Sequence, residues 1–129
     1  MCVAIYKPEG VKTPSLEVLK QCWDANPDGA GFAKRTDGEY SIEIHKGYMT
    51  WKSFVNAYEK YHLADFAGDM LLHFRIATHG GISPGNTHPF SLAGDMLPCV
   101  AIRKCNSISP AKSARRYFSN AALNCFHVM

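Results

Sequence analysis

The chain contains 129 residues, 47% of them apolar and 12% aromatic, with a formal charge of +3 at neutral pH. This length and composition fit one globular domain with a sizeable core, and no apolar run reaches the length of a signal peptide or a membrane span. The five cysteines are odd in number and form no CxxC spacing, so they fit neither a disulfide framework nor a zinc ribbon. We therefore expect a soluble protein of the reducing cytoplasm.

The first part of the chain predicts a strand and a helix. Residues 2–7 are an apolar strand that Pro8-Glu9-Gly10 ends. Thr13 and Pro14 are typical of an N-cap and a first helical residue, and apolar residues at three- and four-residue spacing follow them. This spacing predicts an amphipathic helix over residues 14–25.

A hairpin and a second helix come next. Thr36-Asp37-Gly38 lies between short alternating segments at 31–35 and 39–46, and Asp-Gly in that setting is a hairpin signal. Thr50 then precedes a wide stripe of apolar and aromatic residues that extends to Tyr61. We expect Thr50 to cap a second amphipathic helix.

The remaining elements surround a loop. Residues 70–76 are apolar enough for a central strand covered on both faces. Residues 80–89 are rich in glycine and proline, which predicts a loop of the kind that displays site residues. A further strand is expected at 96–102, interrupted by Pro98, and a last helix is expected to begin at Ser109-Pro110.

Cys2 follows the initiator methionine directly, and removal of Met1 would leave its thiol and a free α-amine on the same residue. An α-amine titrates at about 7.7–8.0, so it can accept the proton of a thiol whose own pKa is near 8.5. This is the chemistry of an N-terminal nucleophile. A buried strand cysteine is the alternative, and the position of Cys2 by itself favours that alternative, since free cysteine is among the most buried residue types.

Three further motifs follow Cys2 in the chain. They are Asn26-Pro27-Asp28-Gly29-Ala30-Gly31-Phe32-Ala33, Arg75-Ile76-Ala77-Thr78-His79-Gly80 and Asn86-Thr87-His88-Pro89. Each is short, but in this order over residues 2–90 they resemble the class II glutamine amidotransferase domain, a family of N-terminal-nucleophile hydrolases. The resemblance covers about the first seven-tenths of the chain.

The resemblance implies a fold and a site. The fold would be α+β, similar to the four-layer αββα arrangement of that family, and incomplete or divergent after about residue 95. Cys2 would be the nucleophile, and Arg75 would hold the α-carboxylate of glutamine, with Thr78 and His79 beside it. Asp28 would shape its turn, and Gly31 would let backbone approach the N-terminal strand. Further structural support near the site would come from Asn86 and His88.

The same residues have simpler interpretations. Arg75 lies in an apolar run and needs an anionic partner, for which a bidentate carboxylate is suited. Without the resemblance, the sequence favours a structural salt bridge between Arg75 and one of the eleven acids. Ordinary turn chemistry accounts for Asp28 and Gly31. Three histidines have spacings that match no compact zinc motif, so we expect no metal: His73, His79 and His88.

The chain departs from its family after residue 95. Related enzymes complete an oxyanion hole with an Asn-Gly pair, and this sequence contains none. Asn106 and Ser107 are the nearest candidates, and no acidic residue after Asp95 is present to bind a substrate α-amine. We therefore divide the chain into an amidotransferase-like core at 1–95 and a basic tail at 96–129, either part of the same domain or poorly packed on it.

These observations predict a glutamine amidohydrolase of weak or lost activity that needs no cofactor. Cys2 would release ammonia from glutamine or a related γ-amide through a thioester, and a separate synthase subunit could accept the ammonia. One alternative is a catalytically inactive amidotransferase-like module for binding or assembly. A weaker alternative is a binder of nucleic acid or another anionic surface through the tail's basic residues: Arg103, Lys104, Lys112, Arg115 and Arg116.

Overall fold

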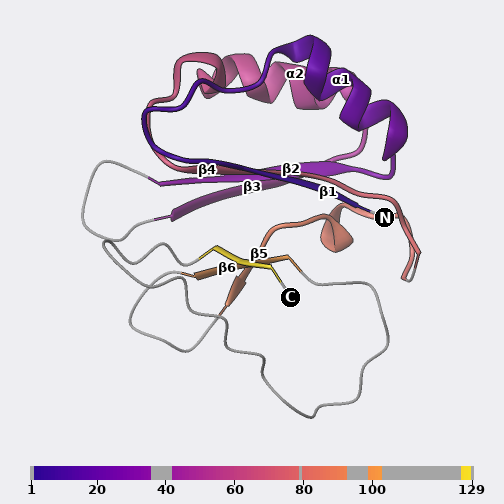
Figure 1. Ribbon diagram of the computed structural model, residues 1–129. Coiled ribbons are helices and arrows are strands. Elements are labelled where there is room, and N and C mark those ends of the chain that lie inside the picture. The colour runs from indigo at the N-terminus through magenta and orange to yellow at the C-terminus, as the bar shows by residue number, and fades with distance from the viewer. Residues whose placement is uncertain (1, 36–41, 79, 93–98, 103–125, 129) are drawn as a thin grey trace.

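Four antiparallel strands form the main sheet of the protein (Figure 1). The computed structural model describes residues 2–35, 42–78, 80–92, 99–102 and 126–128. Within them the sheet has the strand order β1 (Val3–Lys7), β4 (Met70–Phe74), β2 (Ala30–Arg35) and β3 (Ile42–Tyr48). β4 pairs with β1 on one side and with β2 on the other, and all five of its residues are buried. The central strand expected from the apolar run at 70–76 is thus confirmed.

Two helices cover one face of this sheet (Figure 1). They are α1 (Leu16–Ala25) and α2 (Trp51–Lys60). Their buried side chains pack on alternate residues of the strands below, and Phe54 of α2 lies edge-on against Phe74 of β4 with ring centroids 5.1 Å apart. Because Phe54 is fully buried, truncating it to alanine should cost about 3–5 kcal/mol of stability.

The N-cap of α2 is the residue predicted from the sequence, and the N-cap of α1 is a different one. Thr50 caps α2 as expected, and a reciprocal pair of hydrogen bonds with Ser53 completes a capping box. The cap of α1 was expected at Thr13 but is Ser15, whose hydroxyl accepts from the Val18 amide at 3.4 Å. The Thr13 hydroxyl instead donates to the Leu63 carbonyl at 2.6 Å. This tertiary hydrogen bond uses the side chain that was expected to cap α1.

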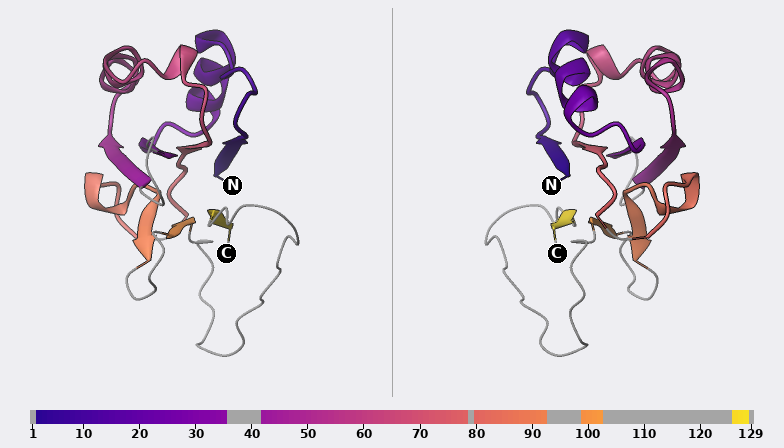
Figure 2. Two further views of the ribbon diagram at one scale, coloured as in Figure 1. Left: turned by 90° about the vertical axis from the view of Figure 1, so that its left-hand side faces the viewer. Right: turned by 90° about the vertical axis from the view of Figure 1, so that its right-hand side faces the viewer.

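A smaller sheet lies on the opposite side of the main sheet from the helices (Figures 1 and 2). It contains β5 (Phe90–Leu92), β6 (Cys99–Ile102) and β7 (Phe126–Val128), with β6 antiparallel to β5 and parallel to β7. β6 falls within the strand expected at 96–102, whereas β5 and β7 were not expected. The Asp37-Gly38 turn and the helix expected from Ser109 lie outside the described residues, although β2 and β3 do pair antiparallel.

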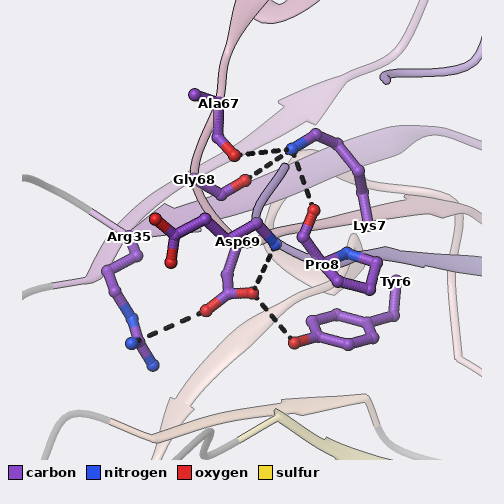
Figure 3. A network of polar contacts seen from close by, with 8 residues as sticks. Tyr6, Lys7, Pro8, Arg35, Ala67, Gly68 and Asp69 are labelled. Carbon is purple, nitrogen blue, oxygen red and sulfur yellow. Dashed lines mark hydrogen bonds and ion pairs between the residues drawn. The ribbon is translucent and has the colours of Figure 1, made fainter. Parts of the chain in front are cut away.

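A polar network ties β1, β2 and β4 together at the end of the sheet remote from Cys2 (Figure 3). Asp69 accepts hydrogen bonds from the Tyr6 hydroxyl and the Glu9 amide, both at 3.0 Å, and lies 3.6 Å from the Arg35 guanidinium. Burial, followed by this contact with Asp69, raises the pKa of Tyr6 to about 12. The buried Asp69 carboxylate therefore joins side chains from two strands and fixes their ends.

The buried ammonium of Lys7 is held by backbone oxygens in the same region (Figure 3). It donates to Gly68 at 2.6 Å, Pro8 at 3.2 Å and Ala67 at 3.3 Å. Removal from water lowers the pKa of Lys7, and the three carbonyl oxygens replace part of the lost hydration. These bonds anchor the segment that enters β4.

These features make the protein α+β, as the sequence predicted, and the α+β fold consists of a four-stranded antiparallel sheet with two helices and a smaller second sheet. No helix in the described part of the chain is long and apolar enough to cross a membrane.

Candidate active site

Cys2 lies immediately before β1, beside the end of β4. Because β1 and β4 are antiparallel, the start of β1 meets the residues that leave β4. The half-buried Cys2 thiol donates to the carbonyl of Ile76 across this junction, with a distance of 3.5 Å from Sγ to oxygen. Cys2 is thus in contact with the segment that carries Arg75.

Arg75 is almost completely buried, with 2% of its surface exposed. Its backbone amide donates to the Gly29 carbonyl at 2.8 Å, which extends the pairing of β4 with β2 by one residue. One guanidinium nitrogen, Nη1, donates to the Gly81 carbonyl at 3.3 Å. A backbone carbonyl from the following loop therefore orients this side chain.

The Asn26-Pro27-Asp28-Gly29 turn fixes the other side of the same segment. The Asp28 amide donates to the Arg75 carbonyl at 2.9 Å, and the Asp28 carboxylate accepts from the Ala77 amide at 2.7 Å. Asp28 thus shapes the turn, as expected, and also holds the strand end that Cys2 contacts from the opposite side. Gly29 has a φ of 118°, and a Cβ there would lie 2.6 Å from a Thr87 methyl group, so only glycine fits.

Gly31 allows a close backbone approach, but by a different partner from the one expected. A Cβ on Gly31 would lie 2.2 Å from the His88 carbonyl oxygen. The N-terminal strand does not reach Gly31, because β4 lies between β1 and β2. The prediction that Gly31 meets the N-terminal strand was therefore wrong, and its role is to receive the loop before β5.

The imidazole ring of His88 packs against that of His73. The two rings have centroids 4.6 Å apart, and the His88 ring lies edge-on to Phe90 at 4.9 Å. His73 is fully buried, and among the described residues neither of its nitrogens has a hydrogen-bond partner. Burial, followed by the charges of His88 and Arg75, lowers the pKa of His73 to about 3. His73 is thus a neutral imidazole at physiological pH.

Lys46, which was not among the expected site residues, anchors the loop that leads to His88. Its ammonium donates to the carbonyls of Gly85 and Thr87, both at 3.2 Å, and lies 3.7 Å from the ring centroid of Phe90. Strand alternation could have identified this residue, because Lys46 follows Ile42 and Ile44 on the inward face of β3. Removal from water lowers the pKa of Lys46.

The structure brings together Cys2, Asp28 and Arg75 at one end of the main sheet, with Thr78 exposed just beyond them. Asn86 reaches this group through the Gly81 carbonyl, which accepts from its side chain at 2.9 Å. Several expected site residues lie outside the described residues: His79, Asn106, Ser107 and the five basic residues of the tail.

No cluster of three potential metal ligands occurs within the described ranges. The chain matches no known protein-family model, and neither a curated protein nor a solved structure is detectably similar to it. The site must therefore be interpreted from its own geometry.

Proposed function

We propose that this protein is a glutamine amidohydrolase of the class II amidotransferase type. In this proposal Met1 is removed, and Cys2 attacks the side-chain amide of glutamine or a related γ-amide. The observation that carries the proposal is the contact of the Cys2 thiol with the backbone of residue 76, directly after the buried Arg75. The nucleophile is then in contact with the chain segment that carries a group able to bind an α-carboxylate.

The proposed reaction uses the two functional groups of one residue. The free α-amine of Cys2 takes the thiol proton, and the thiolate attacks the amide carbon while the carbonyl electron pair moves to oxygen. When this tetrahedral intermediate collapses, the C–N bond breaks and the α-ammonium group gives its proton to the leaving ammonia. Water then attacks the thioester with the amine as base, the C–S bond breaks, and glutamate leaves.

Arg75 supplies substrate recognition in this mechanism. A planar guanidinium matches a carboxylate through two parallel hydrogen bonds, which a lysine cannot reproduce. Its burial strengthens the interaction, because few water molecules compete for the charge. Asp28 supports the site by holding the backbone of residues 75 and 77 in place. Thr78 and His79 are proposed to lie beside the bound substrate.

The proposed function also implies a fold type and a destination for the ammonia. The helix layer, the four-stranded sheet and the second sheet would be three of the four layers of an αββα arrangement of the N-terminal-nucleophile type. The ammonia would pass to a separate synthase subunit in the cytoplasm or simply be released. No cofactor takes part, since the α-amine provides the acid and base chemistry.

A catalytically inactive module is the second candidate, and one observation favours it. The sequence lacks the Asn-Gly pair with which related enzymes stabilise the oxyanion, and loss of one such donor typically lowers kcat by roughly 10²–10³. Turnover should therefore be slow in any case.

The test measures ammonia release from glutamine by the wild-type protein and two cysteine variants. Cys2→Ala should abolish it, whereas Cys22→Ala should retain it, because the half-buried Cys22 lies in α1 on the opposite face of the sheet. Release that persists in Cys2→Ala would refute the proposal. A folded wild-type protein that releases none would favour the inactive module.

A further inference from the structure

The loop at residues 80–87 is fixed to the rest of the protein through its second half. Lys46 donates to the carbonyls of Gly85 and Thr87, both at 3.2 Å. The Gly47 amide donates to the Thr87 hydroxyl at 2.8 Å, and that hydroxyl donates to the Pro84 carbonyl at 2.8 Å. Residues 84–87 therefore form a short 3₁₀ turn held against β3.

The first half of this loop turns back over Arg75. Gly80 has a φ of 73°, and a Cβ placed on it would lie 3.7 Å from Asn86 Nδ2 and 3.9 Å from Arg75 Nη2. The next carbonyl, that of Gly81, accepts two hydrogen bonds from side chains. One comes from Arg75 Nη1 at 3.3 Å and the other from Asn86 Nδ2 at 2.9 Å. Asn86 thus connects the anchored half of the loop to the carbonyl that orients the arginine.

The hydrogen bond to the Gly81 carbonyl restricts how the Arg75 guanidinium can face a carboxylate. The five N–H groups of a guanidinium lie in one plane at fixed angles, so a hydrogen bond to one of them restricts where the others point. Gly81 is exposed, and glycine restricts the backbone least, so a second hydrogen bond helps to hold the direction of its carbonyl. The Asn86 amide provides that second bond from a segment that Lys46 and Thr87 anchor.

We propose that Asn86 is a positioning residue that sets the guanidinium plane of Arg75 for the α-carboxylate of an amino-acid substrate. The inference rests on the proposed function and adds a residue that acts on substrate recognition without touching the substrate. Asn86 is exposed, and its side chain donates to the protein's own backbone. Its replacement should therefore weaken recognition of carboxylate-bearing reagents and leave the reactivity of the Cys2 thiol unchanged.

Two alkylating reagents separate these effects. A diazoketone analogue of glutamine carries the α-carboxylate, whereas iodoacetamide does not. In Asn86→Ala and in the nearly isosteric Asn86→Asp, which lacks the amide donor, the rate of Cys2 labelling by the analogue should fall about tenfold, as expected for the loss of about 1.4 kcal/mol. Labelling by iodoacetamide should stay within about twofold. Ile82→Ala, in the same loop and 62% exposed, is the matched control and should change neither rate.

The outcomes separate the positioning role of Asn86 from the proposed function. An unchanged rate with the analogue in both Asn86 variants would overturn the positioning role while leaving the proposed function intact. An equal fall with both reagents would also overturn it, because that is the effect of a loosened site. A wild-type protein that reacts no faster with the analogue than with iodoacetamide would refute the proposed function itself, and the inference with it.

Discussion

Replacing His73 by asparagine should make the folded protein more resistant to acid. His73 is fully buried opposite Ala4 of β1 and Gly31 of β2, with the His88 ring 4.6 Å away. Burial, followed by the charges of His88 and Arg75, lowers its pKa to about 3. A proton on this imidazole would place a positive charge between another histidine and a guanidinium, away from water. Asparagine is polar but does not titrate.

The direction of the effect follows from proton binding in the two states. An unfolded chain exposes His73 with an ordinary pKa near 6.5, so the unfolded state binds the proton more readily than the folded state. The stability that depends on neutral His73 is fully present above about pH 6.5 and is lost as the pH falls toward 3. Since one pKa unit corresponds to about 1.36 kcal/mol, the total loss is at most about 5 kcal/mol, of which about 3 kcal/mol should be gone at pH 4.

Urea unfolding from about pH 7 to about pH 4 measures this difference. The free energy of unfolding of the wild type should fall more steeply than that of His73→Asn, with the gap between the two curves changing by about 3 kcal/mol. His62→Asn is the matched control, because His62 is exposed and has a φ of 50°, a conformation that asparagine tolerates. Parallel curves for the wild type and His73→Asn would show that the buried imidazole has no part in acid unfolding.

Three further predictions concern the site, the network and the tail. Arg75→Lys should impair glutamine hydrolysis nearly as much as Arg75→Ala, mainly through a raised KM, and an unchanged KM in either variant would assign Arg75 a structural role only. Asp69→Asn should lower the free energy of unfolding by about 1–3 kcal/mol in urea titrations, because it removes the charge that faces Arg35; no change would mean that the network contributes nothing. Ser107→Gly should leave turnover unchanged, whereas a rise of tenfold or more in kcat would assign Asn106 and Ser107 to the oxyanion hole.

The four strands of the main sheet and both helices could be predicted as separate elements because their signals are local. The apolar run of β4 and the cap at Thr50 need no knowledge of distant residues. The choice between Thr13 and Ser15 could not be made from the sequence, because both are good cap residues and a contact with the Leu63 carbonyl decides it. β5 and β7 have three residues each, too few for a periodic pattern.

The candidate site could be predicted as a set of residues but not as a set of contacts. Cys2 and Arg75 are far apart in sequence, and the antiparallel pairing of β1 with β4 places their segments together. One acceptor of the Arg75 guanidinium is the Gly81 carbonyl, and a backbone group leaves no signal in a sequence. The approach of His88 to Gly31 likewise depends on the path of a whole loop.

Intact-mass analysis after incubation with the diazoketone analogue of glutamine tests whether Cys2 is an N-terminal nucleophile. We expect a protein that lacks Met1 and carries one adduct, which peptide mapping places on Cys2 and not on the other four cysteines. A protein that retains Met1 cannot expose the Cys2 amine. Retention of Met1, or labelling spread evenly over all five cysteines, would contradict the assignment of Cys2 as an N-terminal nucleophile.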